Sequence, residues 1–357
     1  MKQLFSCFIL LMTLVSCHTD IDEVTLVTVN EYKILEDITP SEFINTDPVY
    51  ICFSDTSDLS FSFKEISKIV IKNDKIFILE SGNRRLLVFN KTGEPYSKME
   101  YRGRGPKEYL QITDFDVDDE DNIWIVDAQK NDIYKYSDKC ILEKSYPFQY
   151  EITKIACLKN QSFLCEIGSW DMSEYSGSQL VLADSLFNIK SVLTEYSKNT
   201  DPNFVFQSEI SRGKDTFFYC SPIEDKLIEI SNDGTIEREM MFDFGSRQVP
   251  EHYKKNIEKH YERINADYSF VFRTYRVCKD YITLGLHNNG WQSLILNCAD
   301  KTGLISDAEV SGMSLIGQCS EGSIWQLHSS ENCSSLPVQV QNWLKSDLDV
   351  IFILPDE

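Results

Sequence analysis

Two neighbouring segments of the chain repeat the same order of apolar and polar positions. Residues 66–93 read ISKIVIKNDKIFILESGNRRLLVFNKTG and residues 112–140 read ITDFDVDDEDNIWIVDAQKNDIYKYSDKC, so that Ile66 aligns with Ile112 at an offset of 46. In each segment three short runs alternate apolar with polar residues, and Asn, Asp and Gly separate the runs. This pattern is typical of β-strands joined by hairpin turns. With the runs that follow, PYSKMEY and ILEKSYPF, each unit has four strands.

Fainter copies of this unit continue towards the C-terminus. The third to sixth contain EITKIACLKNQSFLCEI, DTFFYCSP, VFRTYRVCKDYITLGL and MSLIGQCSEGSIWQLH. The sixth lacks strands, since only VIFILP remains, while PVYICFSD (48–55) is a strand without a unit of its own. A four-stranded unit roughly every 40–47 residues is the signature of a propeller blade. The pattern predicts an all-β fold, a six-bladed β-propeller of four-stranded antiparallel blades over residues 46–357, closed by N- and C-terminal strands in one blade.

Two segments depart from the β pattern. Residues 250–268 begin with a proline and carry Tyr253, Ile257, Tyr261 and Ile264 on one helical face. This spacing predicts an amphipathic helical insertion at about 249–267, between blades four and five, and residues 336–345 predict a shorter helix. Residues 17–45 have no strong periodicity, and we interpret them as a tether followed by a packed arm.

The N-terminus has the layout of an export signal. Lys2 precedes an apolar run that is too short to span a bilayer, so residues 1–16 are expected to form a signal peptide. The segment LVSC resembles a bacterial lipobox, which implies cleavage before Cys17 and acylation of its thiol. The alternative is an ordinary signal peptide followed by a chance cysteine. The acidic residues just after Cys17 (HTDIDEVT) resemble a surface-export signal or form a solvated tether, which leaves open the side of the outer membrane that the protein faces.

Charge and cysteine content narrow the function classes. The formal charge is −21, and it becomes −22 without residues 1–16, which hold one lysine and no acid. A strongly acidic surface repels nucleic acid, so we expect no nucleic-acid partner. Of the 11 cysteines most lie singly in apolar strands. Cys157 and Cys165 flank a short turn and either pair across a hairpin or stay as buried free thiols, which we expect.

The turn RGRGPKEY (102–109) is glycine-rich and basic, but it does not fit a phosphate loop. Pro106 has no N–H, Glu108 occupies the place of a third glycine, and a strand follows instead of a helix. We interpret it as the connection between two blades. The motif formed by Gly103, Gly105, Pro106, Glu108 and Tyr109, followed by ITDFDVD and NIWIVD, resembles the six-bladed β-propeller lipoproteins of Bacteroidetes, which are related in architecture to NHL-repeat and TolB-like propellers. The resemblance implies the fold and a lipid anchor in the outer membrane of the cell envelope. It implies no particular activity.

The propeller architecture predicts a candidate ligand site. Blade-to-blade turns and the turns between second and third strands leave the blades at the same face, which brings three turns together. The candidate residues are Arg84, Arg85, Arg102, Arg104, Lys107, Glu108, Tyr109 and Asp127. Guanidinium groups bind carboxylates and phosphates, so this face is a candidate site for an anion or an acidic sugar. The alternative is that the arginines pair with Glu80, Glu108 and Asp127 to hold the turns together.

Catalytic motifs are scarce. His252 and His260 are too far apart in sequence for a zinc helix, GMSLIG lacks the spacing of a nucleophile elbow, and the acidic run 116–121 fits a hairpin turn better than a calcium loop. We therefore expect no metal and no cofactor. Trp170, Trp291 and Trp325 lie near strand ends, where they either stack on sugar rings or pack between blades.

Two hypotheses for the function remain. The first is a non-catalytic, monomeric binding or scaffold module that presents one propeller face to a glycan, peptide or protein partner. The alternative is a metal-dependent hydrolase or lactonase with oxygen ligands in the central channel, for which Asp114, Glu209 and Asn288 are candidates. No motif links these three residues, so we expect the binding module.

Overall fold

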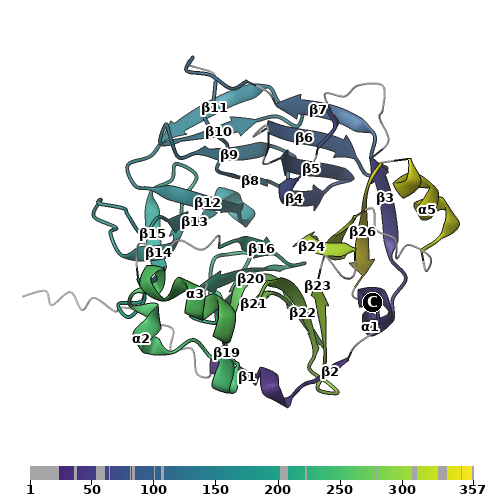
Figure 1. The fold of residues 1–357 in the computed structure, drawn as a ribbon. Helices are drawn as coiled ribbons and strands as arrows, with labels where there is room; N and C mark the ends of the chain where they lie inside the picture. Colours follow the sequence, from purple (N-terminus) through teal and green to yellow (C-terminus); the bar gives the residue numbers. More distant parts are fainter. Residues whose placement is uncertain are drawn as a thin grey trace, which may run out of the picture.

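The structure is a computed structural model of the chain, and it is an all-β ring of six sheets (Figure 1). It describes residues 24–35, 38–53, 61–63, 65–80, 82, 85–99, 101–105, 108–201, 208–221, 223–277, 280–307, 312–328, 336–346 and 348–355. The expected signal peptide and Cys17 lie outside these residues. The sheets are blades with four antiparallel strands each, as the repeat predicts, and two of them carry a fifth strand on the edge.

The blades follow one another along the chain. The first three consist of β4 (Ile66–Lys72), β5 (Lys75–Glu80), β6 (Arg85–Asn90) and β7 (Pro95–Met99); β8 (Asp114–Val117), β9 (Ile123–Asp127), β10 (Asp132–Tyr136) and β11 (Leu142–Pro147); and β12 (Ile152–Cys157), β13 (Phe163–Ile167), β14 (Ser178–Ala183) and β15 (Ile189–Glu195). Blades 4 and 5 consist of β16 (Ile210–Arg212), β17 (Thr216–Ser221), β18 (Lys226–Ser231) and β19 (Ile236–Asp243); and β20 (Ser269–Val277), β21 (Tyr281–Asn288), β22 (Trp291–Asn297) and β23 (Thr302–Asp307). The first strand of each blade lies at the centre of the ring, where it meets the first strands of its neighbours (Figure 1).

Blade 6 closes the ring with strands from both ends of the chain. Its order is β24 (Met313–Gln318), β25 (Gly322–Leu327), β26 (Asp349–Pro355) and β3 (Val49–Phe53). The strand predicted within residues 48–55, β3, is therefore the outermost strand of the C-terminal blade. The turn between β6 and β7 presses on it: a Cβ on Gly93 would lie 2.2 Å from the Cys52 carbonyl oxygen, and the residue has φ +88°. Only glycine fits this contact between blades 1 and 6.

The N-terminal arm contains two strands that the sequence pattern does not show. β1 (Val24–Thr28) pairs in parallel with β19, and β2 (Lys33–Leu35) pairs in parallel with β23. Between them lies a single 3₁₀ turn (Val29–Glu31), and after them comes α1 (Pro40–Ile44), which begins with a capping box between Thr39 and Glu42. The arm thus runs along the outer edges of blades 4 and 5 before it enters blade 6 (Figure 1). It covers strand edges that would otherwise be open to other chains.

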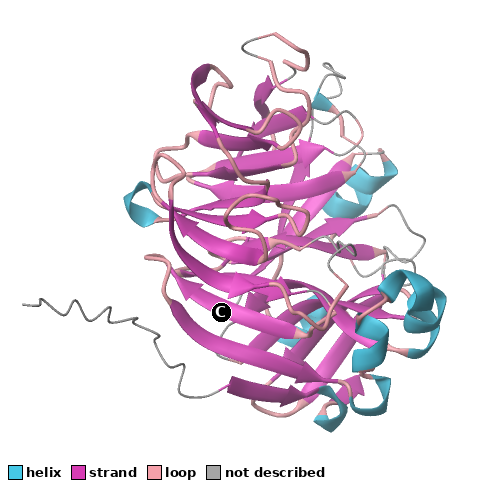
Figure 2. Cartoon of the chain, turned by 90° about the vertical axis from the view of Figure 1, so that its left-hand side faces the viewer, coloured by secondary structure: helices cyan, strands magenta, loops and turns pink. Residues whose placement is uncertain are grey.

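The helical insertion lies between blades 4 and 5, where it was predicted. It consists of a 3₁₀ turn (Gly245–Arg247), α2 (Glu251–Lys254) and α3 (Ile257–Asp267), and a further helix, α5 (Val338–Lys345), precedes β26. Ile257 and Ile264 are buried against Phe270 of the first strand of blade 5. In the view of Figure 2, α2 and α3 lie on one side of the stack of sheets. Among the described residues, no helix has the length and apolar character needed to cross a membrane.

The core consists of apolar layers between successive blades. One layer joins blade 1 to blade 2 and contains Phe77, Val88, Phe115 and Ile125, all fully buried. Cys157 and Cys165 are buried free thiols. The strand register places Cys157 opposite Phe163 and Cys165 opposite Ile155, so the two cysteines do not face each other across the hairpin. The short 3₁₀ segment Lys159–Gln161 forms that hairpin turn.

Candidate functional site

The central channel is filled by ion pairs between the innermost strands. Lys68 of blade 1 bonds Asp114 of blade 2 at 2.9 Å, and Arg212 of blade 4 bonds Asp116 of blade 2 at 2.6 Å. A third pair joins blades 4 and 5, with Arg273 Nε 3.1 Å from Glu209 Oε2. Asp114 and Asp116 also accept hydrogen bonds from the backbone N–H groups of blade 3, at 2.9 and 2.6 Å. Each carboxylate therefore ties neighbouring blades together.

The pKa values of Lys68, Asp116 and Arg212 are shifted towards their charged forms despite their burial. Burial opposes ionisation, but Asp114, Asp116 and Glu209 raise the pKa of Lys68, and Arg212 and Lys68 lower the pKa of Asp116. Three cations and three anions balance one another. A small cavity of about 20 Å³ lies beside the buried Gln318, roughly the size of one water molecule.

The oxygen ligands of the hydrolase hypothesis are engaged in this network or close to it. Asp114 and Glu209 pair with cations, as described above. Asn288 accepts a hydrogen bond from Ser269 Oγ at 3.0 Å and donates one to Gln292 at 3.3 Å. Among the described residues, no three His, Cys, Asp or Glu side chains gather in a way that could hold a metal ion.

The turn of residues 101–109 is held by the residues that make its sequence distinctive. The Glu108 carboxylate folds back and accepts a hydrogen bond from the Gly105 N–H at 2.8 Å. A Cβ on Gly103 would lie 1.9 Å from Glu108 Oε2, so the carboxylate fits only over glycine. Tyr109 is buried and donates from its hydroxyl to the Met99 carbonyl at 3.1 Å, while Lys130 donates to the Gly105 carbonyl at 3.1 Å. In this structure Glu108 and Tyr109 support the turn from within.

The other predicted site residues divide between the interior and the surface. Asp127 is fully buried and accepts the Leu110 N–H at 2.6 Å, and Arg85 is buried in an ion pair with Glu80 at 2.8 Å. These contacts match the alternative in which charged residues hold the turns together. Two arginines lie at the surface: Arg102 and Arg104 are exposed, and Arg102 donates to the Leu110 carbonyl at 3.2 Å. Arg84 and Lys107 lie outside the described residues.

Two tryptophans are exposed at the same end of the blades as this turn, which we call the loop face. It is the end at which β7 leads into β8 and at which the second and third strands of each blade connect. Trp170 is 50% exposed in the β13–β14 loop, and its ring lies over Gly168, where a Cβ would be 2.8 Å away. Trp291 is 56% exposed at the start of β22 and packs edge-on against Phe272 and His287. Trp325, in contrast, is fully buried between strands.

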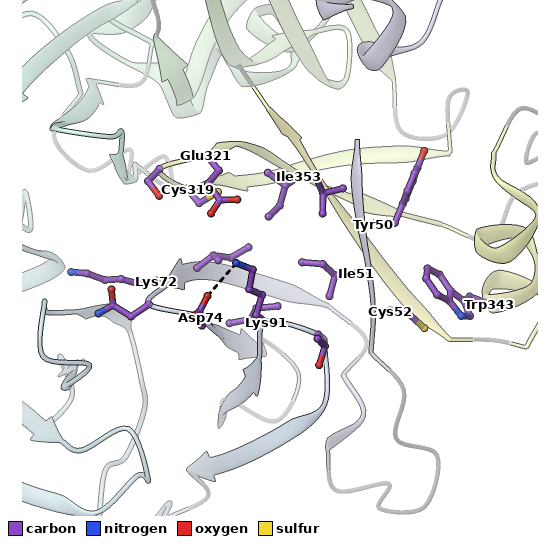
Figure 3. Close-up of a pocket in the computed structure, with 16 residues that line it drawn as sticks. Tyr50, Ile51, Cys52, Lys72, Asp74, Lys91, Cys319, Glu321, Trp343 and Ile353 are labelled. Atoms are coloured by element: carbon purple, nitrogen blue, oxygen red, sulfur yellow. Dashed lines mark hydrogen bonds and ion pairs between the residues drawn. The ribbon is translucent and has the colours of Figure 1, made fainter. Parts of the chain in front are cut away.

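A groove lies at the opposite end of the blades, at the junction of blades 6 and 1 (Figure 3). It has a volume of about 470 Å³, and we call it the seam groove. Its apolar wall comes from β3 and β26, with Ile51 and Ile353, and its charged mouth comes from the β4–β5, β6–β7 and β24–β25 turns. Asp74 and Lys91 form an ion pair of 3.2 Å there. No local motif indicates this groove, because its walls come from the two ends of the chain.

The comparisons with known proteins agree on the fold. A family model described as a 6-bladed beta-propeller, DUF5128, matches residues 17–280. A protein from Bacteroides fragilis that is described as exported aligns with a TM-score of 0.76 and 16% identity, over 93% of this chain and 100% of its own. A duf4221 family member from Bacteroides vulgatus aligns with a TM-score of 0.55 and 10% identity, over 86% and 96% of the two chains. No match was found among the curated proteins.

Proposed function

The chain belongs to the DUF5128 family of six-bladed β-propellers, and from that premise we propose that it is an exported binding module that holds an acidic carbohydrate on its loop face. In this proposal it is anchored to the outer membrane through a lipid on Cys17 and acts without catalysis. The export signal at residues 1–16 and the similarity to an exported Bacteroides fragilis protein support the location.

The proposal of an acidic carbohydrate as ligand rests on one observation. Two aromatic rings, of Trp170 and Trp291, and two guanidinium groups, of Arg102 and Arg104, are exposed on the loop face. An exposed indole ring offers a flat apolar face and one N–H donor, which suits stacking on a sugar ring. Arg102 and Arg104 supply the positive charge that a uronic acid needs, on a protein whose overall formal charge is −21. The position of Trp170 over Gly168 fixes its ring, which lowers the entropy cost of binding.

The test is calorimetric titration of residues 18–357 with oligogalacturonate and with a neutral xylan oligomer of equal length. We expect binding of oligogalacturonate, and a loss of affinity of about tenfold, or ~1.4 kcal/mol, in each of Trp170→Ala, Trp291→Ala and Arg102→Ala. Tyr96, which is 42% exposed on the outer strand β7, provides the control substitution Tyr96→Ala. Equal affinity for both oligomers, or no effect of the tryptophan variants, would contradict the proposal.

A further inference from the structure

We propose that the seam groove is a second binding site, specific for a small organic cation with an apolar body, such as the N-terminal end of a short hydrophobic peptide. This site lies at the opposite end of the blades from the loop face and does not depend on the carbohydrate proposal. It would allow the propeller to carry two unlike ligands at once.

The size and walls of the groove suit a small ligand with an apolar body. Its volume of about 470 Å³ falls in the range of small-molecule sites, roughly 300–1,000 Å³. Ile51 and Ile353 are diagonal neighbours on adjacent strands, and Val49, which pairs with Ile353 and is 52% exposed, extends the apolar lining. Ile51 and Ile353 are 7% and 5% exposed and form a packed floor, so the apolar surface in contact with water is mainly that of Val49.

The lining of the groove holds two carboxylates and two lysines, and one of the lysines is engaged by a residue outside the groove. Glu321 is exposed and lies across from the Asp74–Lys91 pair (Figure 3), and among the described residues it has neither a hydrogen bond nor an ion pair. Lys72 extends away from this pair and is engaged by Asp119 at 2.7 Å. Two carboxylates thus face one available ammonium group, which favours a cationic ligand.

The existing ion pair offers little resistance to such a ligand. Asp74 is 80% and Lys91 is 65% exposed, and exposed pairs of this kind contribute little to stability. An incoming ammonium group can therefore bind Glu321 and share Asp74 with Lys91. Because Gly93 presses against β3, the walls are fixed before the ligand arrives.

The test uses leucyl-phenylalanine amide, which has a free ammonium group, and its N-acetylated form, titrated calorimetrically into residues 18–357. We expect the free amine to bind at least about tenfold more tightly than the acetylated form, since a hydrogen bond to a charged group is lost on acetylation. Glu321→Gln should weaken binding of the free amine about tenfold, whereas Glu237→Gln, at an exposed site on blade 4, should leave it unchanged. Val49→Ser should weaken both peptides about equally.

Three results would overturn the proposal: no binding of either peptide, equal affinity for both, or unchanged affinity in Glu321→Gln. The two sites can be separated in the same protein. Trp170→Ala should leave peptide binding unchanged, and Glu321→Gln should leave oligogalacturonate binding unchanged.

Discussion

The buried carboxylate of Asp225 should make the stability of the protein depend on pH. Asp225 lies in the β17–β18 turn, is 0% exposed, and accepts hydrogen bonds from the Val271 N–H at 2.7 Å and from the Gln248 amide. Burial raises the pKa of this carboxyl from 3.8 to about 7, although the hydrogen bonds and Lys254 oppose the shift. The residue thus joins blade 4 to the first strand of blade 5 and to the segment before the helical insertion.

The sign and size of the effect follow from the two pKa values. Because the folded pKa is raised, the folded protein keeps this proton up to about pH 7, while the unfolded chain loses it near pH 3.8. The contribution of this group to the free energy of unfolding is therefore fully present below pH 3.8 and is lost as the pH rises towards 7. The folded pKa of about 7 and the unfolded pKa of 3.8 together correspond to a loss of about 4 kcal/mol in the free energy of unfolding, at ~1.4 kcal/mol for each pH unit.

Asp225→Asn cannot titrate and should remove this loss, while its amide oxygen can keep the bond from the Val271 N–H. Asparagine also tolerates the positive φ of 56° at this position. We expect the variant to match the unsubstituted protein at pH 4 and to exceed its free energy of unfolding by up to about 4 kcal/mol at pH 8, measured by urea unfolding.

Asp184 supplies the control for this experiment. Its pKa is lowered by a hydrogen bond from Asn188, so Asp184→Asn should gain no stability at pH 8. If Asp225→Asn is no more stable than the unsubstituted protein at pH 8, the Asp225 carboxylate is ionised in the fold and the reasoning from burial is refuted.

Three other features of the fold can be tested by substitution or labelling. Lys68→Met leaves the buried Asp114 carboxylate without its cation and should lower the free energy of unfolding by about 3–5 kcal/mol, measured by urea unfolding. Lys72→Met is the comparison. Its partner Asp119 is exposed, so the loss should be under about 1 kcal/mol. Gly103→Ala should destabilise the fold by about 1–3 kcal/mol, because the added Cβ would meet the Glu108 carboxylate that folds over the turn. Gly82→Ala is the control and should change little, since its nearest atom would lie 3.8 Å away. Equal shifts of the thermal midpoint in the two variants would contradict this. Burial raises the pKa of the Cys140 thiol to about 11, so iodoacetamide at pH 8 should label it only after unfolding, as mass spectrometry of its peptide will show.

The repeat in the sequence predicts contacts between blades as well as the number of blades. Lys68 and Asp114 stand 46 residues apart, which is the offset that aligns the first two units, and they meet at the channel. Equivalent positions of successive blades are neighbours in the ring, so residues one repeat apart are candidates for direct contact.

The arm and the seam groove could not be read from the sequence in the same way. β1 and β2 have five and three residues, and each pairs with a strand more than 200 positions away, so neither has a hairpin turn or a long enough alternation to reveal it. The groove needs Ile51 and Ile353 on adjacent strands, which only the closed ring provides. Arg85 and Asp127 were predicted on the correct turns, but sequence pattern cannot distinguish a buried ion from an exposed one.

The course of the arm has a consequence for how the molecule stands relative to a bilayer. The described chain begins at Val24, on the outer edge of blade 4 and not on either face of the ring. With a lipid on Cys17 as proposed, the chain from Cys17 to Val24 spans at most about 25 Å. The ring of blades would then stand with its plane perpendicular to the membrane and the outer edge of blade 4 nearest to it. The loop face and the seam groove would both point sideways, and a long polymer could pass along either side without meeting the lipid headgroups.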